Sequence, residues 1–425
     1  MSLRHPTGAE RILICGPVFP VGTVGGLPLA LADLASALEQ LGWVVDVAVT
    51  PSSLGLRTRD QRAGGPAWTR RRWAWLPSLR WCPEGVRTWL QHLLLGGGIA
   101  KTQSDAFVAL EVRLAQVSYA VVIACVSREC PGVAAFATAR HTRVLLLSLN
   151  GLASELRLAR WLWLPRLFAR GAHRGMHHDC YRAIGVDQIK HAVFASESWR
   201  GEAIAAGVPE AVAQVIPFGC AVPGRLDPLR AVTGRLLWVG RCSREKGLHL
   251  FLDAVAILRR TRGVTLTAIC GPGPENYRMF IDQRITDLRL SDIVEFRSAV
   301  PRGALQDAYR DHDVLLFQSP FKEPAALVLM EAFGAGIPVV APGPGMASGL
   351  VVPDETCVCF RTARPEIVSA AIERALSDDA LRRRIRVAAH TLVTREYSVE
   401  AMGRRYDRVL QQMLEAEARP APMTL

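Results

Sequence analysis

The feature that most constrains the fold is a repeated alternation along the chain. Short apolar runs rich in β-branched residues alternate with stretches of helical character. Parallel strands buried on both faces read as continuous apolar runs, and a helical crossover joins each to the next. The pattern therefore predicts doubly wound parallel sheets covered by helices, the α/β class. The predicted strands are 11–16, 44–50, 119–126, 143–149, 191–196, 214–218, 235–240, 264–270, 293–297, 314–318, 338–341 and 357–360.

The alternation is interrupted once, between Phe218 and Pro228, where glycines and prolines are typical of a linker. At roughly 150 residues per domain, a chain of 425 residues has room for two or three domains. We predict two Rossmann-like domains of similar size, over 1–222 and 223–400, followed by a C-terminal helix and tail over 401–425. Ligands of such sheets bind at the carboxyl ends of the strands, so two facing domains would hold a ligand in the cleft between them.

Composition limits the cellular setting. Half of the residues are hydrophobic and 21% are charged, which suits large buried cores. No apolar run approaches the ~18–20 residues of a membrane span, and the first residues lack the apolar core of a signal peptide. We expect a cytoplasmic protein.

The net charge of +12 is compatible with a nucleic acid, an anionic membrane surface or an acidic small molecule as partner. Tryptophan and arginine are interleaved over 69–75, 80–81 and 156–166, which suits a membrane surface or a nucleic acid. Core tryptophans beside a solvated arginine face would give the same pattern. Nearly all basic residues are arginine, so a lysine in a candidate site is notable.

Two segments of the second half carry candidate chemistry. Arg241 and Lys246 follow a predicted strand, where their charges would stabilise a leaving diphosphate without a metal. Glu323 follows the strand 314–318, and Glu331 lies in the next helix in an apolar setting. A buried carboxylate needs partners, and a ribose diol is a good one. The start of that helix, around 325–328, offers free N–H groups to a phosphate.

Other motifs are weaker. Gly25 and Gly26 follow the first strand and allow close approach of a phosphate, but a plain tight turn explains them equally well. The spacing is not G-x-G-x-x-G, and no acidic residue ends the second strand, which argues against a nicotinamide dehydrogenase. Asp311 and Asp313 have the spacing of a metal motif. They precede a strand, at the amino end of the sheet, so we expect no metal site there.

Together these motifs resemble family 4 glycosyltransferases, the retaining, nucleotide-sugar-dependent enzymes of the GT-B fold. The resemblance is carried by Gly25-Gly26, Val239-Gly240-Arg241 with Lys246-Gly247, Gly271-Pro-Gly273, and Glu323-x7-Glu331 followed by Gly336-Ile-Pro-Val-Val. It is nearly continuous from about 235 to 360 and looser in the first domain.

The resemblance implies roles for the site residues. Glu323 would contact the donor sugar and Glu331 the donor ribose. Arg241 and Lys246 would hold the diphosphate with the backbone N–H groups of Leu327 and Val328. The nucleobase would lie beside Arg297 to Val300. Gly25 and Gly26 would face the diphosphate and the acceptor from the first domain. No cofactor or divalent metal is implied, because the nucleotide sugar is a co-substrate.

This sequence departs from the family pattern at two places. Ala325-Ala326 replaces a Phe-Gly pair in the loop that cradles the sugar, and Asn150 replaces a histidine that faces the C6 end of the donor. Both changes are compatible with a donor sugar that has an unusual or enlarged C6 end. The alternative is that a neighbouring side chain fills the space left by the histidine and that the donor is an ordinary hexose.

The sequence therefore predicts a retaining glycosyltransferase whose first domain binds the acceptor and whose second binds the donor. The acceptor is a small molecule of specialised natural-product chemistry or a lipid-linked glycan, the latter with peripheral membrane contact. The other hypotheses are polysaccharide assembly, an inactive relative that binds nucleotide sugars, a GT-B epimerase or phosphorylase, and a nucleic-acid binder, the last of which we do not favour.

Overall fold

The computed structural model describes residues 10–17, 26–50, 56–57, 114, 117–126, 143–148, 189–318, 326–343 and 349–418. The chain forms two compact units. The first comprises Met1–Pro20, Leu27–Ile216 and Arg404–Leu425, and the second comprises Val21–Gly26 and Pro217–Gly403.

At the C-terminus, the boundary between the two units differs from the predicted domain boundary. Helix α13, Val399–Ala418, begins in the second unit and continues into the first. There Trp43 Nε1 donates a hydrogen bond to Asp407 Oδ1 at 2.8 Å, and the ring of Tyr406 is fully buried. The last helix is therefore part of the first domain's core, where the prediction had a separate terminal segment.

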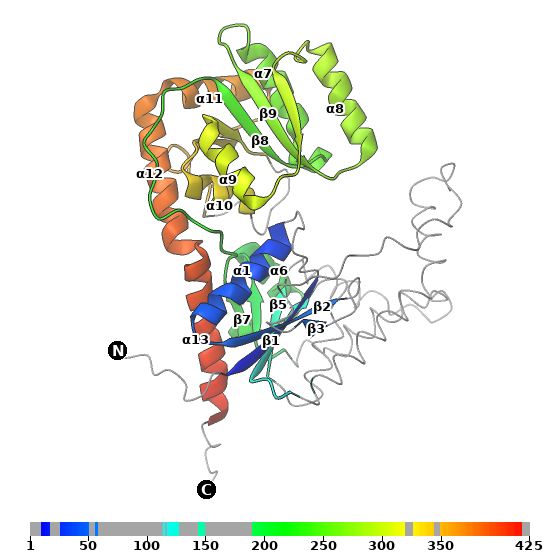
Figure 1. Ribbon diagram of the computed structural model, residues 1–425, viewed down its shortest axis with the longest axis vertical. Coiled ribbons are helices and arrows are strands. Elements are labelled where there is room, and N and C mark those ends of the chain that lie inside the picture. Colours follow the sequence, from blue (N-terminus) through cyan, green and yellow to red (C-terminus); the bar gives the residue numbers. More distant parts are fainter. Residues whose placement is uncertain are drawn as a thin grey trace, which may run out of the picture. The chain divides into compact units, whose positions relative to one another are not determined.

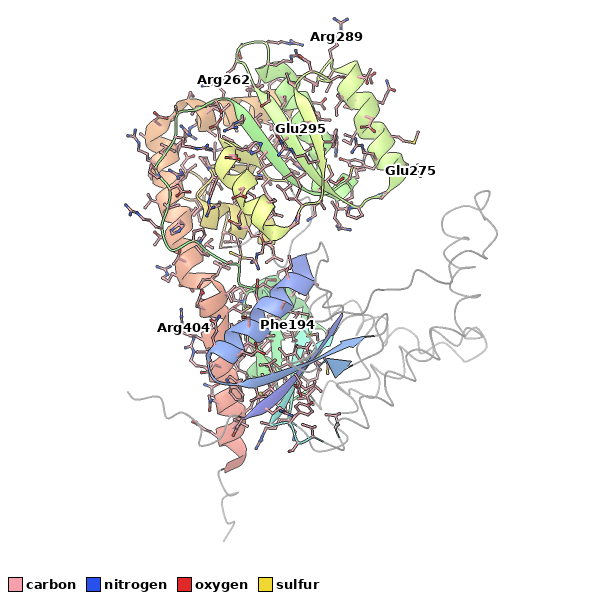
Figure 2. All side chains as sticks on the ribbon, in the orientation of Figure 1. Phe194, Arg262, Glu275, Arg289, Glu295 and Arg404 are labelled. Atoms are coloured by element: carbon pink, nitrogen blue, oxygen red, sulfur yellow. The ribbon has the colours of Figure 1, made fainter. Side chains whose placement is uncertain are left out.

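The first domain is built on a seven-stranded sheet in the order β3-β2-β1-β4-β5-β6-β7. All neighbours in it are parallel except β3, which pairs antiparallel with β2. Phe194 of β6 is fully buried in this domain (Figure 2). The strands are β1 Arg11–Pro17, β2 Val44–Thr50, β3 Leu56–Arg57, β4 Val121–Val126, β5 Val144–Ser148, β6 Ala192–Phe194 and β7 Ala213–Val215, with helices α1 Gly26–Gln40 and α6 Glu197–Ala205.

The second domain is a six-stranded, all-parallel sheet in the order β10-β9-β8-β11-β12-β13. Figure 1 shows β8 and β9 of this sheet side by side, with α7 and α8 in the same domain. In sequence order this is 3-2-1-4-5-6, the doubly wound arrangement whose strand order reverses between the first and fourth strands. The strands are β8 Arg235–Arg241, β9 Thr265–Gly271, β10 Val294–Ser298, β11 Val314–Leu316, β12 Val339–Pro342 and β13 Val358–Phe360. The helices are α7 Leu248–Leu258, α8 Glu275–Asp287, α9 Arg302–Asp311, α10 Leu327–Ala335, α11 Pro365–Ser377 and α12 Asp379–Glu396.

One apolar core holds the second domain together. Residues of α7, α8 and α11 pack on the strands, with Trp238, Phe251 and Phe360 among the buried side chains. Burying a large apolar side chain contributes about 1.5–3 kcal/mol each, so this core supplies a rigid platform for the loops at its edge.

The predicted fold class is confirmed. Every predicted strand is present, with its ends shifted by at most three residues. The strand β3 was not predicted, because two residues at a sheet edge are too short to show an alternation.

Candidate functional site

The switch point of the second-domain sheet lies between β8 and β11, which pair directly. At the carboxyl end of the sheet, Arg241 of β8 is aligned with Gly271 of β9, and Ser298 of β10 is aligned with Cys270 of β9. The turns after β8, β9 and β10 therefore open on one edge of the sheet, beside the segment that follows β11. This edge is where doubly wound sheets bind ligands.

The turn after β8 is a short 3-10 helix, Arg244–Lys246, closed by Gly247 in the left-handed conformation at φ 68°. A Cβ on Gly247 would lie 2.4 Å from Gln318 Cγ, so only glycine lets the turn approach the end of β11. Trp238 Nε1 donates to the carbonyl of Lys246 at 3.3 Å. The buried indole therefore fixes the backbone from which the Lys246 ammonium projects.

The electrostatics of this turn favour an anion. Burial, and then the neighbouring charge of Arg241, lowers the pKa of Lys246 to about 8, while Glu245 opposes the shift. Arg241 Nη2 lies 3.1 Å from Glu245 Oε1, with the Arg241 side chain largely exposed. Two cations held together cost free energy that a bound anion would recover.

The glycine pair after β9 brings a second backbone against this turn. Cys242 donates its N–H to the carbonyl of Gly271 at 3.1 Å. A Cβ on Gly273 would lie 1.8 Å from the carbonyl oxygen of Cys242, so no larger residue fits. The Gly271-Pro-Gly273 motif thus fixes the backbone that lies beside Arg241.

Helix α10 presents its N-terminus at the same edge. Its N-cap, Ala326, is buried, and neither a side-chain cap nor an acidic residue in the first turn satisfies its N–H groups. Leu327 and Val328 are the first helical residues and are half-buried. The first N–H groups of a helix have no intrahelical acceptor and carry the positive end of its dipole, which suits a phosphate.

Glu331, in the second turn of α10, is 8% exposed. Tyr309 donates its hydroxyl to Glu331 Oε2 at 3.3 Å, and Arg302 Nε lies 3.9 Å from Oε1. Burial, and then the charge of Glu331, raises the pKa of Tyr309 well above its usual value, so the hydroxyl remains a donor. The carboxylate is thus held by side chains of α9.

Arg297 and Val300 lie at the end of β10, an edge strand. Arg297 makes a two-fold contact with Glu295, Nε to Oε1 at 2.8 Å and Nη2 to Oε2 at 2.9 Å, and both residues are exposed. Val300 is half-buried in the turn before α9. Their proposed place beside a nucleobase stays a prediction.

Several predicted site residues lie outside the described residues, namely Gly25, Asn150, Glu323 and Ala325. The tryptophan- and arginine-rich stretches lie outside them as well. Gly26 is the first residue of α1.

The structure adds residues that the sequence analysis did not assign. Gln318 is buried against Gly247, and its Oε1 has no hydrogen-bond partner in the described part of the chain. Its place at the carboxyl end of a strand was the available signal. Arg302 and Tyr309 approach Glu331 only through the packing of α9 on α10, which no sequence spacing reveals.

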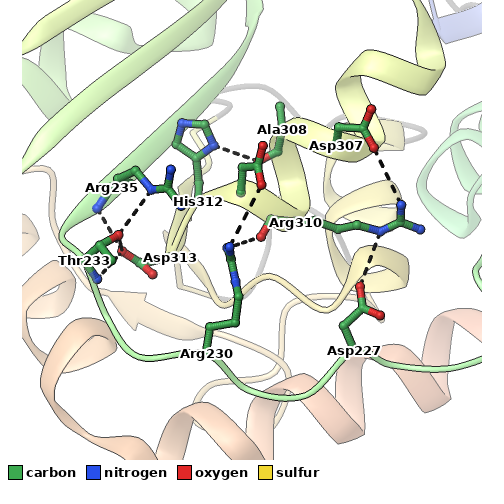
Figure 3. Close-up of polar contacts among 10 residues, drawn as sticks. Asp227, Arg230, Thr233, Arg235, Asp307, Ala308, Arg310, His312 and Asp313 are labelled. Carbon is green, nitrogen blue, oxygen red and sulfur yellow. Dashed lines mark hydrogen bonds and ion pairs between the residues drawn. The ribbon is translucent and has the colours of Figure 1, made fainter.

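Asp311 and Asp313 lie at the opposite end of the sheet. Asp313 Oδ2 accepts hydrogen bonds at 2.9 Å from Thr233 N, Thr233 Oγ1 and Arg235 N (Figure 3). The intervening His312 contacts Ala308 O at 2.7 Å and Thr267 Oγ1 at 3.0 Å. Asp313 therefore holds in place the segment that leads into β8. Within the described residues, no group of three or more His, Cys, Asp or Glu could hold a metal ion.

Comparison with known proteins finds a family match in the second domain. Residues 233–391 match the family model described as glycosyl transferases group 1. The second domain is thus similar to group 1 glycosyltransferases. D-inositol 3-phosphate glycosyltransferase of Paenarthrobacter aurescens is 31% identical over 36% of this chain and 38% of its own length. Alpha-D-kanosaminyltransferase of Streptomyces kanamyceticus is 26% identical over 40% of this chain and 43% of its own length.

The likeness in structure extends further than the likeness in sequence. Anabaena Alr3699/HepE, solved in complex with UDP-glucose, matches with a TM-score of 0.64 at 18% identity, over 95% of this chain and 99% of that one. The two Rossmann-like domains are those of the GT-B fold. The chain aligns with about two fifths of each of the two curated relatives described above. Among the described helices, none is both long and apolar enough to cross a bilayer.

Proposed function

We propose that this protein is a retaining glycosyltransferase that moves a sugar from a nucleotide diphosphate to an acceptor nucleophile. The observation that carries the proposal is Lys246, a half-buried cation beside Arg241 at the switch point of a domain that matches the group 1 glycosyltransferases. Burial and the neighbouring charge of Arg241 lower its pKa, and the negative charge of a donor diphosphate would favour its charged form.

The arrangement supports binding of a nucleoside diphosphate in the second domain. Arg241, Lys246 and the N–H groups of Leu327 and Val328 would hold the phosphate oxygens. Glu331 would accept hydrogen bonds from the ribose hydroxyls, held in place by Tyr309. The buried Oε1 of Gln318 is a further acceptor at this edge.

In the transfer step, the bond between the anomeric carbon and the diphosphate oxygen breaks while the acceptor oxygen bonds to the same face of that carbon. The acceptor proton passes to the leaving diphosphate, so the two products are the glycoside and the nucleoside diphosphate. Cations fixed at the developing charge lower the barrier, because they need no reorganisation during the reaction. Glu323 would orient the sugar.

The finer proposal is a donor with an altered C6 end, used in specialised natural-product chemistry. Asn150 and Ala325-Ala326 motivate it, and the relative named as a kanosaminyltransferase supports it. A donor panel tests it, with Asn150→His beside the wild type. We expect the wild type to ignore plain hexose donors and the variant to gain them. A wild type that prefers plain UDP- or GDP-hexoses would contradict this substrate class.

Two measurements test the general proposal. A panel of nucleotide sugars should contain one that raises the melting temperature, since a ligand of the native state stabilises it by mass action. Product analysis by NMR should show a retained anomeric configuration. An inverted product, or an epimerised or phosphorolysed sugar, would reject the assigned reaction.

We also propose that the transfer needs no divalent metal, because Arg241, Lys246 and the start of α10 supply the positive charge that a metal supplies elsewhere. Turnover in excess EDTA should equal turnover in its absence. Loss of activity that Mg²⁺ or Mn²⁺ restores would overturn this.

A further inference from the structure

A cavity of about 390 Å³ lies at the amino end of the second-domain sheet, opposite the edge that carries the proposed donor site; of its lining residues, Tyr309 also contacts Glu331. Its walls come from the linker before β8, the ends of α9 and α10, and α12. Small-molecule sites have about 300–1,000 Å³, so it has room for a ligand larger than a single ion. β8 spans the distance between the two edges, about 20 Å for seven residues.

The wall formed by α12 is cationic. Arg382 is 3% exposed; its Nη1 donates to Asp379 Oδ1 at 2.9 Å, and its Nε is buried with no hydrogen-bond partner among the residues that the structure describes. A buried guanidinium N–H without an acceptor costs free energy that a ligand oxygen would recover.

Arg386 lies one helical turn further along α12 and lines the same cavity. Its Nη2 donates to the carbonyl of Asp227 at 2.9 Å, and its Nε donates to the carbonyl of Gly336. These two acceptors are main-chain carbonyls, which satisfy the hydrogen bonds without neutralising the charge. Burial, and then the like charge of Arg382, lowers the pKa of Arg386, with Asp227 opposing and Arg230 adding to the shift.

The carboxylates that line the cavity differ from one another in exposure. Asp313 Oδ2 is occupied by three donors, whereas the side chains of Asp227 and Asp311 are 66% and 65% exposed. Asp311 lies 4.0 Å from Arg230 and Asp227 lies 3.5 Å from Arg310 (Figure 3). The cavity therefore has a basic interior and acceptor oxygens at its rim.

We infer that this cavity binds a small phosphorylated polyhydroxy compound, of the size of a hexose phosphate. The guanidinium groups of Arg382 and Arg386 bind the phosphate, for which their planar donor geometry is suited. The rim carboxylates of Asp227 and Asp311 accept hydrogen bonds from hydroxyl groups. This inference does not rest on the proposed function, because none of these residues belongs to the donor site.

Calorimetric titration with glucose 6-phosphate and with inorganic phosphate, at constant ionic strength, tests the site. The wild type should bind both, with the sugar phosphate about tenfold tighter, as one or two added hydrogen bonds to a carboxylate imply. Arg386→Gln should weaken both by about 10–100-fold, the effect of removing a charged hydrogen-bond donor. Arg383→Gln, an exposed position of the same helix, is the matched control and should bind as the wild type does.

Two further variants keep the test decisive. If Arg386→Gln fails to fold, Arg230→Gln should still weaken phosphate binding, because Arg230 lines the same cavity and adds a third positive charge to it. Lys246→Ala should leave both affinities unchanged, which separates this cavity from the donor site. The inference is overturned if neither probe binds, if binding survives in the Arg386 and Arg230 variants, or if it is lost in Lys246→Ala.

Discussion

Two buried carboxylates of the second domain, Asp313 and Glu331, lie on either side of β11 and are held in different ways. Asp313 precedes the strand, and its Oδ2 accepts three hydrogen bonds at 2.9 Å, two of them from main-chain N–H groups. Glu331 follows the strand in α10, and it contacts the side chains of Tyr309 and Arg302, at 3.3 and 3.9 Å.

We take this difference to separate a structural carboxylate, Asp313, from Glu331, the carboxylate that we propose binds the donor ribose. Main-chain donors fix Asp313 where the linker enters β8, at the amino edge of the sheet. Glu331 lies on the element that follows the carboxyl edge, where α/β sheets bind their ligands, and side-chain partners can readjust around a ligand. Changes at the carboxyl edge should therefore reduce turnover while sparing stability, and changes at the amino edge should do the reverse.

The largest effect is expected for Lys246→Ala. Turnover should fall by about 10²–10³, the usual cost of removing a donor that stabilises developing charge. The melting temperature should change little, because the indole of Trp238 contacts the carbonyl of Lys246, which the variant keeps. Steady-state kinetics with thermal melting checks both, and turnover near the wild-type rate would contradict the assignment.

The converse change is Asp313→Ala, which removes the acceptor of three hydrogen bonds. It should lower the free energy of unfolding by about 2–4 kcal/mol, because buried donors lose their partner. Urea denaturation measures this, with the exposed Asp311→Ala as control. The folded fraction should keep its KM for the donor; a raised KM would show that this edge takes part in donor binding.

The pH dependence of kcat/KM tests the role assigned to Lys246 at the carboxyl edge. Because the pKa of Lys246 is lowered to about 8, the free enzyme loses this cation as pH rises above that value. The ratio kcat/KM should therefore fall about tenfold per pH unit on the alkaline side, with the apparent pKa near that of Lys246. In Lys246→Arg the fall should disappear up to about pH 10, since arginine stays charged. An unchanged alkaline limb in that variant would assign the titration to another group.

The smallest expected effect is that of Tyr309→Phe. Losing one hydroxyl donor to Glu331 costs about 1 kcal/mol, so KM for the donor should rise about three- to tenfold with kcat nearly unchanged. Tyr277→Phe, whose hydroxyl contacts His249 at 2.9 Å, is the control. Equal effects in both variants would mean that Tyr309 does not position Glu331.

The strands could be predicted because parallel sheets buried on both faces require continuous apolar runs, as in Arg235–Arg241. The turn bearing Arg241 and Lys246 was predicted from its place after such a run, and the structure puts it at the switch point. The place of Asp313 was deduced in the same way, because a residue before a parallel strand lies at the amino edge.

The features that the sequence did not predict depend on contacts between segments far apart in the chain. Arg302 and Tyr309 approach Glu331 because α9 packs on α10, and this pairing has no fixed sequence spacing. The return of α13 to the first domain likewise rests on contacts such as that of Trp43 with Asp407, far apart in the chain. The cavity at the amino edge is lined by both the linker and α12, which are far apart in the sequence. The sequence alone therefore could not predict that Arg382 and Arg386 line a cavity.

The most direct test of the central claim is calorimetric titration of nucleoside diphosphates into the wild type, Lys246→Ala and Arg244→Ala. Arg244 occupies the same turn but contacts the ring of Phe280, which makes it the matched control. The account predicts that one diphosphate binds the wild type and the Arg244 variant alike and binds Lys246→Ala at least about tenfold more weakly, as loss of a charged hydrogen bond implies. The matching nucleoside without phosphates should bind all three equally. Equal diphosphate affinity in the wild type and Lys246→Ala would contradict the claim that this lysine holds the donor diphosphate.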